Sequence, residues 1–212
     1  MQFNPIFNPS KKVNDRIFQN IKKVIKHGKF ILGPEVIKLE ESLKKFVNSK
    51  YCLCVSSGTD ALYLALKTLK QNFKKGEIIT TPFTFFSPSE TIINAGFKPV
   101  YADIELNDYN ISVNTIKSKI NKNTVGILPV HIFGYPCDMP GIMQLAKQNN
   151  LFVIEDCAQA LGAKIDNKFV GSFGDINAFS FYPTKNLGAF GDAGLVSTKK
   201  NKLYNFIKLL KN

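Results

Sequence analysis

The sequence predicts an α/β fold built on a mainly parallel sheet. Short apolar runs alternate along the chain with segments whose apolar residues recur at helical spacing, as in strand–helix–strand units. One run, residues 151–155, is apolar at its first four positions, which is typical of a parallel strand buried on both faces. With 212 residues, the chain is long enough to enclose a substantial core.

Two helices are predicted ahead of the first strand. Residues 11–27 place apolar side chains along one helical face, and Gly28 ends that helix. Pro34, directly after a glycine, opens a second helix that runs to about Phe46. We therefore expect an N-terminal helical segment at about residues 1–47.

The rest of the chain alternates between predicted strands and predicted helices. The expected strands are residues 52–55, 77–81, 98–103, 125–130, 151–155, 176–182 and 194–197. The expected helices are residues 61–69, 87–95, 112–120, 140–149 and 201–212. Because the last helical pattern reaches the final residue without a cap, we expect the sequence to be truncated relative to a longer protein.

The formal net charge of +12 raises the possibility of a basic nucleic-acid-binding module. Arg16 is the single arginine among the 28 cationic residues, whereas nucleic-acid readers favour the bidentate arginine fork. The lysines are spread singly or in pairs, as on solvated helix faces. The net positive charge therefore does not indicate a nucleic-acid partner, although it is compatible with attraction of an anionic substrate.

Cysteine and histidine usage argues against a metal site. Cys52 and Cys54 are one residue apart rather than two to four, and His27 and His131 are the only histidines. The scattered thiols fit reduced core residues in a cytoplasmic protein. The first residues lack a basic segment followed by an apolar one, and apolar runs are too short to span a membrane.

Asp156 and Lys185 are the residues that most clearly indicate chemistry. Asp156 follows the apolar run of residues 151–155, so it is expected at the carboxyl end of a parallel strand, where open α/β sheets bind ligands. Lys185 precedes a glycine-dense stretch that permits close backbone approach. A lysine can form a Schiff base with pyridoxal phosphate, and an aspartate can keep its ring nitrogen protonated. Taken alone, Asp156 is also compatible with a helix cap, and Lys185 with a surface lysine.

Other residues fit the same cofactor. Gly58 and Thr59 begin a predicted helix directly after a strand, which makes an anion site, although this turn is equally compatible with simple capping. Ser180 precedes Lys185 and is a candidate for the same phosphate. Phe85 is a candidate to stack on a flat ring, with core packing as the alternative.

Together these motifs resemble the sugar-aminotransferase family typified by the DegT/DnrJ/EryC1/StrS proteins, a branch of the fold type I pyridoxal phosphate enzymes. The matching stretches occur in family order over nearly the whole chain. They are residues 33–40, 56–62, 82–85, 129–134, 155–162 and 180–188. The resemblance implies a three-layer α/β/α large domain over residues 1–212, with the C-terminal small domain of the family missing.

The resemblance also assigns roles to individual residues. Lys185 would carry the cofactor and transfer protons, Asp156 would pair with the ring nitrogen, and Gln159 would contact the side of the ring's phenolic oxygen. Gly58, Thr59 and Ser180 would hold the phosphate. Phe85 would stack on the ring.

The function implied by the resemblance is transfer of an amino group from glutamate to a keto group of a nucleotide-linked deoxysugar, for amino-sugar biosynthesis. The resemblance implies a homodimer in which each site is completed by the partner chain. Related dehydratases carry histidine in place of the lysine, so Lys185 argues against dehydration. A truncated, non-catalytic remnant of such an enzyme remains the alternative.

Overall fold

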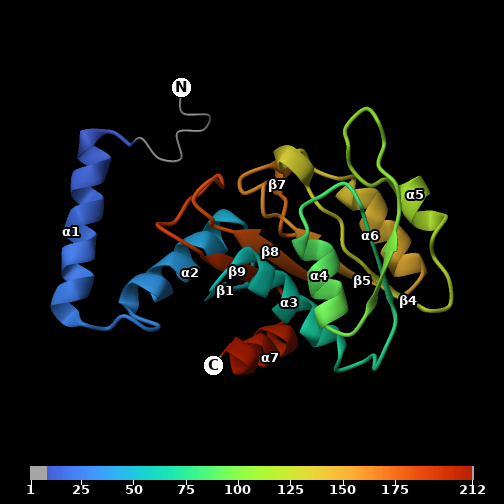
Figure 1. Cartoon of the computed structure of the whole chain (residues 1–212), viewed down its shortest axis with the longest axis horizontal. Coiled ribbons are helices and arrows are strands. Elements are labelled where there is room, and N and C mark those ends of the chain that lie inside the picture. The colour runs from blue at the N-terminus through green and yellow to red at the C-terminus, as the bar shows by residue number, and fades with distance from the viewer. Residues whose placement is uncertain (1–8, 212) are drawn as a thin grey trace.

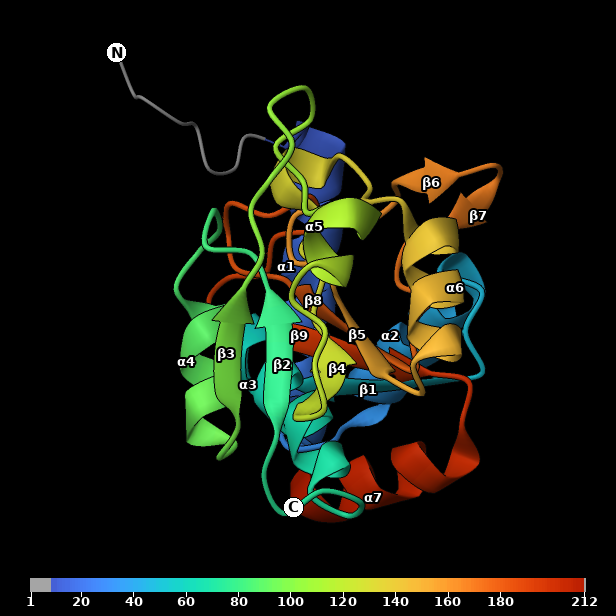
Figure 2. The same ribbon diagram turned by 90° about the vertical axis from the view of Figure 1, so that its right-hand side faces the viewer.

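The computed structural model describes residues 9–211. Residues 1–8 of the expected N-terminal segment and Asn212 of the last expected helix lie outside the described residues. The body of the molecule has three layers, in which helices cover both faces of a central seven-stranded sheet (Figures 1 and 2). The predicted α/β/α architecture is therefore confirmed.

The sheet is mainly parallel, as predicted. Its strand order is β1-β9-β8-β5-β4-β2-β3, and β9 alone runs antiparallel to its two neighbours. The strands are β1 (Tyr51–Val55), β2 (Glu77–Thr80), β3 (Lys98–Tyr101), β4 (Thr124–Ile127), β5 (Phe152–Asp156), β8 (Ile176–Ser180) and β9 (Gly194–Thr198). Because β8 and β9 are antiparallel, the connection between them stays at the edge where the parallel strands end.

The helices are divided between the two faces of the sheet, as Figure 2 shows. Helices α3, α4 and α7 pack on one face, and α2, α5 and α6 on the other. The helices are α1 (Lys11–His27), α2 (Pro34–Phe46), α3 (Gly58–Leu69), α4 (Ser87–Asn94), α5 (Val113–Lys117), α6 (Met139–Gln148) and α7 (Asn201–Lys211).

Successive strand residues feed the two cores alternately. Ile78 packs with the α3 face and its neighbour Ile79 with the α6 face, and Ile154 and Val153 divide in the same way. Side chains alternate across a strand, so a sheet covered on both faces needs apolar residues at consecutive positions. This requirement explains the uninterrupted apolar runs of the sequence.

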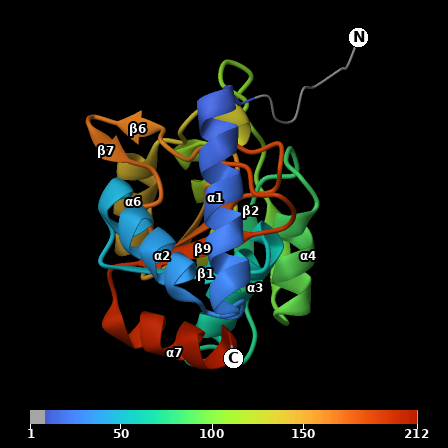
Figure 3. The ribbon, with the colours of Figure 1, turned by 90° about the vertical axis from the view of Figure 1, so that its left-hand side faces the viewer.

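Helix α1 stands apart from the three layers at the left of Figure 1. Figure 3, viewed from that side, shows α1 in front of the rest of the molecule. None of its residues is buried, and Phe18 and Ile25 on its apolar side are 61% and 64% exposed. Phe30 and Ile31, in the connection to α2, are also exposed. The amphipathic pattern thus predicted the helix, but its apolar face finds no core within the part of the chain that the structure describes.

Several predicted elements end earlier in the structure. The helix expected over residues 112–120 ends at Lys117, and the strand expected over 125–130 ends at Ile127. The strands expected over 98–103 and 176–182 end at Tyr101 and Ser180. A short hairpin was not predicted. It joins β6 (Lys164–Ile165) to β7 (Lys168–Phe169) through Asp166 and Asn167, both with positive φ. Two-residue strands are too short for an alternating pattern to reveal them.

Within residues 9–211, no helix combines the length and the apolar character that crossing a bilayer would require.

Candidate active site

All seven residues predicted from the sequence line one cavity of about 490 Å³ at the carboxyl edge of the sheet. This volume lies within the range of small-molecule sites. The cavity includes the ends of β5 and β8, the start of α3, and the connection from β8 to β9. The predicted residues in its lining are Gly58, Thr59, Phe85, Asp156, Gln159, Ser180 and Lys185.

The start of α3 forms a narrow cradle against the end of β8. Ser57 Oγ accepts the Asp60 N–H at 3.0 Å, so capping is confirmed for Ser57. The N–H groups of Gly58 and Thr59 precede the first intrahelical bond and lie at the positive end of the helix. A Cβ on Gly58 would lie 2.7 Å from the Cβ of Ser180, so only glycine permits this close approach. The cradle has the donors and the space that an anionic group requires.

Asp156 ends β5 with its carboxyl group almost enclosed. The residue is 4% exposed, and its Oδ1 accepts the Ala158 N–H at 2.9 Å. No helix follows it directly, so the helix-cap alternative is wrong. Burial raises the pKa of the Asp156 carboxyl above its ordinary value, while the Ala158 N–H and the positive charge of Lys185 act in the opposite direction. A cation inside the cavity would therefore be stabilised by this carboxylate.

Lys185 lies in the connection from β8 to β9 and faces the same cavity. It is half-buried, and its N–H donates to the carbonyl of Tyr182 at 2.8 Å. A Cβ on Gly188 would lie 2.5 Å from the Pro183 carbonyl oxygen, so the tight path of this loop depends on glycine. The alternative of an ordinary surface lysine does not fit this position.

Gln159 and Phe85 complete the predicted set. Gln159 Oε1 accepts the Phe133 N–H at 2.7 Å, which leaves the amide NH₂ as the group available to the cavity. Phe85 is 72% exposed beside the cavity, so the alternative of core packing is wrong for this ring. An exposed aromatic face and an amide donor together suit a flat, oxygen-bearing ligand.

Sequence reasoning missed several polar residues in the cavity lining. Thr59 Oγ1 and Ser87 Oγ share a hydrogen bond of 2.7 Å, which ties α3 to the start of α4. Ser87 follows Phe85 within two residues, and this proximity was the available signal. The other unpredicted polar lining residues are Ser57, Thr84, Tyr182, Thr184 and Asp192.

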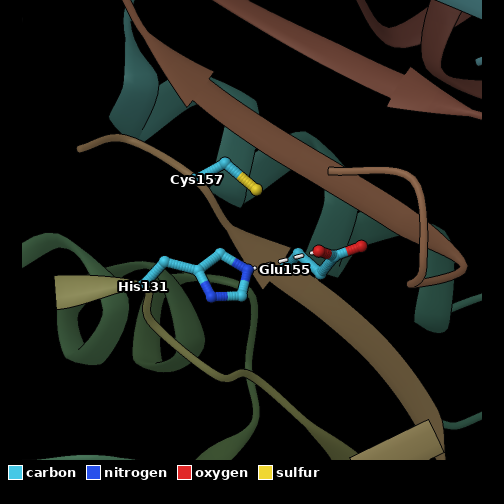
Figure 4. A group of neighbouring side chains, drawn as sticks. All are labelled: His131, Glu155 and Cys157. Atoms are coloured by element: carbon cyan, nitrogen blue, oxygen red, sulfur yellow. Dashed lines mark hydrogen bonds and ion pairs between the residues drawn. The ribbon is translucent and has the colours of Figure 1, made fainter. Parts of the chain in front are cut away.

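Three buried residues behind the cavity carry atoms that could bind a metal, but these atoms are not free to do so. Ligand atoms of His131, Glu155 and Cys157 lie within 4.8 Å of one another (Figure 4). His131 already hydrogen-bonds through both ring nitrogens, to Glu155 and to the Cys137 N–H. Burial raises the pKa of the Cys157 thiol well above its ordinary value, whereas metal binding needs the thiolate. We therefore assign no metal to this group.

The fold and the cavity define a class of protein. A lysine and a buried aspartate meet at the carboxyl edge of a mainly parallel α/β/α domain, which is the arrangement of the large domain of fold type I transferases. The family model of the DegT/DnrJ/EryC1/StrS aminotransferases matches residues 11–212. The chain belongs to this family.

Comparison with known proteins gives the same picture. A UDP-N-acetyl-3-dehydro-α-D-glucosamine 3-aminotransferase of Acidithiobacillus ferrooxidans is 42% identical over 200 residues, covering 94% of this chain and 54% of that protein. An aminotransferase from Psychrobacter cryohalolentis superimposes with a TM-score of 0.89 at 35% identity, covering 97% and 51%. NtdA from Bacillus subtilis, solved with bound cofactor PMP, superimposes with a TM-score of 0.86 at 32% identity, covering 93% and 44%. The chain thus spans about half the length of these relatives.

Proposed function

We propose that this chain is the cofactor-binding part of a pyridoxal phosphate-dependent aminotransferase. The enzyme would transfer an amino group from glutamate to a keto group of a nucleotide-linked deoxysugar, for amino-sugar biosynthesis. The observation that carries this proposal is that a lysine, a buried aspartate and a glycine-lined helix start face one cavity. Family membership and a relative named for an amino-sugar nucleotide support it.

The residues of the cavity fit the cofactor. The cradle of Gly58, Thr59 and Ser180 suits the phosphate because it offers helix N–H groups and hydroxyls where a Cβ would not fit. The buried carboxylate of Asp156 would pair with the ring nitrogen. The NH₂ group of Gln159 would face the phenolic oxygen, with Phe85 against the ring and Lys185 as its amine partner.

The mechanism follows from these positions. When bound, pyridoxal phosphate supplies an electron sink for the carbon that loses a proton. Asp156 maintains that sink by holding a proton on the ring nitrogen. Lys185 Nζ removes the proton from the amino-bearing carbon of glutamate, and it later returns a proton to the former keto carbon of the sugar. The same two side chains therefore serve both halves of the reaction.

We propose residues 1–212 as the large domain of this enzyme, with an N-terminal helical segment at about residues 1–47. The small domain typical of the family would be supplied by chain outside the present sequence. We further propose a cytoplasmic homodimer without nucleic-acid or membrane partners. The exposed apolar side of α1 supports self-association, since such surfaces commonly mark interfaces.

The visible absorbance of the purified chain with added pyridoxal phosphate tests the proposal. We expect a visible band that depends on the Lys185 amine, is absent in Lys185→Ala, and is bleached by glutamate. Lys147→Ala, which changes an exposed lysine of α6, is the matched control and should keep the band. A soluble, monodisperse wild-type chain without the band would instead support the non-catalytic remnant.

A further inference from the structure

The Glu155 carboxylate is the most heavily hydrogen-bonded side chain behind the cavity. It is 0% exposed. Its Oε2 lies 3.2 Å from His131 Nε2 and accepts the Gly171 N–H at 2.8 Å. Its Oε1 accepts the N–H groups of Phe173 at 2.7 Å and Gly174 at 2.5 Å. Two donors on each oxygen satisfy an ionised carboxylate and leave no place for a proton.

The tautomer of His131 follows from its second contact. Its Nδ1 accepts the Cys137 N–H at 3.0 Å, so this nitrogen carries no hydrogen. A neutral ring then bears its hydrogen on Nε2 and donates it to Glu155. Figure 4 marks this contact with a dashed line. The ring therefore acts as a fixed link between the loop at residue 137 and the buried carboxylate.

This pair is attached directly to Asp156. Glu155 precedes Asp156 in β5, and the two side chains point to opposite faces. The His131 backbone N–H donates to the Asp156 carbonyl at 3.1 Å, and the Asp156 N–H donates to the Pro129 carbonyl at 2.9 Å. His131 thus binds residue 155 through its ring and residue 156 through its backbone. Any shift of the ring would move the strand end that carries Asp156.

Two other walls of the cavity depend on the same pair. The turn of residues 171–174, held by Glu155, leads into β8, which ends at Ser180. Gly171 has a φ of +79°, and a Cβ there would collide with the Phe179 ring, so this turn has little freedom. On the other side, Phe133 lies two residues after His131 and holds Gln159 through its N–H.

We propose that Glu155 and His131 are positioning residues that hold Asp156 and Gln159 in the cofactor cavity. Neither residue lines the cavity, so the pair acts through the backbone. The inference depends on the proposed function only for the identity of the ligand. The hydrogen-bond network itself is a property of the chain.

The carboxylate cannot be replaced by its amide without a conflict. In Glu155→Gln, whichever way the amide is turned, its NH₂ group meets two N–H donors. Two buried N–H groups would then lose their acceptor, which is costly. His131→Gln is milder, because a glutamine amide can still donate to Glu155 but no longer accepts the Cys137 N–H.

Amide hydrogen exchange of the full chain without cofactor tests the inference directly. We expect Glu155→Gln to lower the protection of the Ala158 and Phe133 amides by roughly 10- to 100-fold, because the lost hydrogen bonds to residue 155 destabilise the strand end and the loop that carry them. His131→Gln should lower both by less. Ile207→Ala, in the core on the sheet face opposite the Glu155 side chain, is the control for general destabilisation. It should leave the protection of the Ala158 and Phe133 amides, relative to other core amides, unchanged. Wild-type protection of both amides in Glu155→Gln would overturn the inference. If Glu155→Gln does not fold, His131→Gln decides by the same readout.

Cofactor affinity provides the second readout. We expect Glu155→Gln to raise the dissociation constant for pyridoxal phosphate by about tenfold or more. Loss of groups that orient the direct ligands of a metal site has an effect of this size. Ile207→Ala should leave it unchanged. Equal affinity in wild type and Glu155→Gln would refute the positioning role. A wild-type chain that binds no cofactor would refute the proposed function, and amide exchange would still decide on the pair. Tight, stoichiometric Zn²⁺ binding that is lost in His131→Gln would also overturn the positioning role and would instead indicate a metal centre.

Discussion

The charge of Asp156 is costly for the chain when nothing opposes it. The carboxyl group is buried, and burial raises its pKa, so the ionised form is less favourable than in the unfolded chain. A protonated ring nitrogen placed against it would recover this cost. Sites that carry out chemistry often hold such unfavourable groups, which gain their partner when the ligand binds.

Asp156→Asn should therefore stabilise the chain without cofactor at neutral pH. A folded pKa above the unfolded value contributes stability that is complete below the ordinary aspartate pKa of about 4 and is lost as the pH rises through the folded pKa. Asparagine does not ionise, and its oxygen can still accept the Ala158 N–H. Thermal unfolding at pH 7 and at pH 4 checks this. A wild-type chain that is more stable than the variant at pH 7 would contradict it.

Gln159→Glu should weaken binding of an oxygen-bearing anion in the cavity. The Phe133 N–H fixes one oxygen of the side chain and leaves the NH₂ group for the ligand, so glutamate would present an oxygen at the same place. We expect a loss of roughly 10-fold or more in affinity for pyridoxal phosphate, since an ionised group then faces the ligand without a partner. Fluorescence titration measures it, with Gln148→Glu on α6 as the control. An unchanged affinity would place the phenolic oxygen elsewhere.

At the scale of elements, the cavity depends on how closely α3 approaches β8. Gly58 permits this contact with Ser180, and Gly194 permits another, because a Cβ there would collide with the Ser57 carbonyl group. These two glycines bring the start of α3 close to the end of β8 and to the start of β9. The phosphate cradle is therefore a product of packing between two elements rather than of the turn sequence alone.

Gly58→Ala should destabilise the fold by about 1–3 kcal/mol, the usual cost of overpacking. The added Cβ would lie 2.7 Å from the Ser180 Cβ, so Ser180→Gly should relieve part of the loss in the double variant. Denaturant unfolding of the two single variants and the double variant gives the coupling energy. Strictly additive effects would show that a clash between residues 58 and 180 does not cause the loss of stability in Gly58→Ala.

Most elements were predictable because each obeys a local rule. Pro34 and Gly28 mark helix ends, and the apolar run before Asp156 marks a doubly covered strand. The hairpin at residues 164–169 was missed because its turn residues adopt positive φ without glycine. The end of β4 was misplaced because Val130 pairs with Asp156 only through an isolated bridge, which no local pattern specifies.

At the scale of the whole molecule, α1 is the element whose sequence and surroundings disagree. Its spacing of apolar residues predicts a buried face, yet no residue of the helix is buried in the described chain. A second copy of the chain is the partner that the proposed homodimer would supply. Covering this face would remove exposed apolar side chains, among them Phe18 and Ile25, from water.

Phe18→Asp with Ile25→Asp should abolish self-association and leave the stability of the monomer within about 0.5 kcal/mol, as for most exposed substitutions. Both side chains are more than half exposed, so the single chain loses little packing. Light scattering over a range of concentrations measures the association, and Lys23→Ala on the same helix is the control. A dimer that survives the double substitution would place the interface elsewhere.

The sequence by itself determined the alternation of strands and helices, the carboxyl-edge position of Asp156, and the residues expected to meet at the site. The first two follow from local rules, because periodicity, proline and glycine act over a few residues, and the expected site residues follow from such rules together with the family resemblance. Only the tertiary structure decided that β9 runs antiparallel, that Gln159 presents its NH₂ group, and that Glu155 and His131 support Asp156 from behind. Each of these depends on contacts between residues distant in the chain, and such contacts are set by packing and hydrogen-bond satisfaction rather than by local preference.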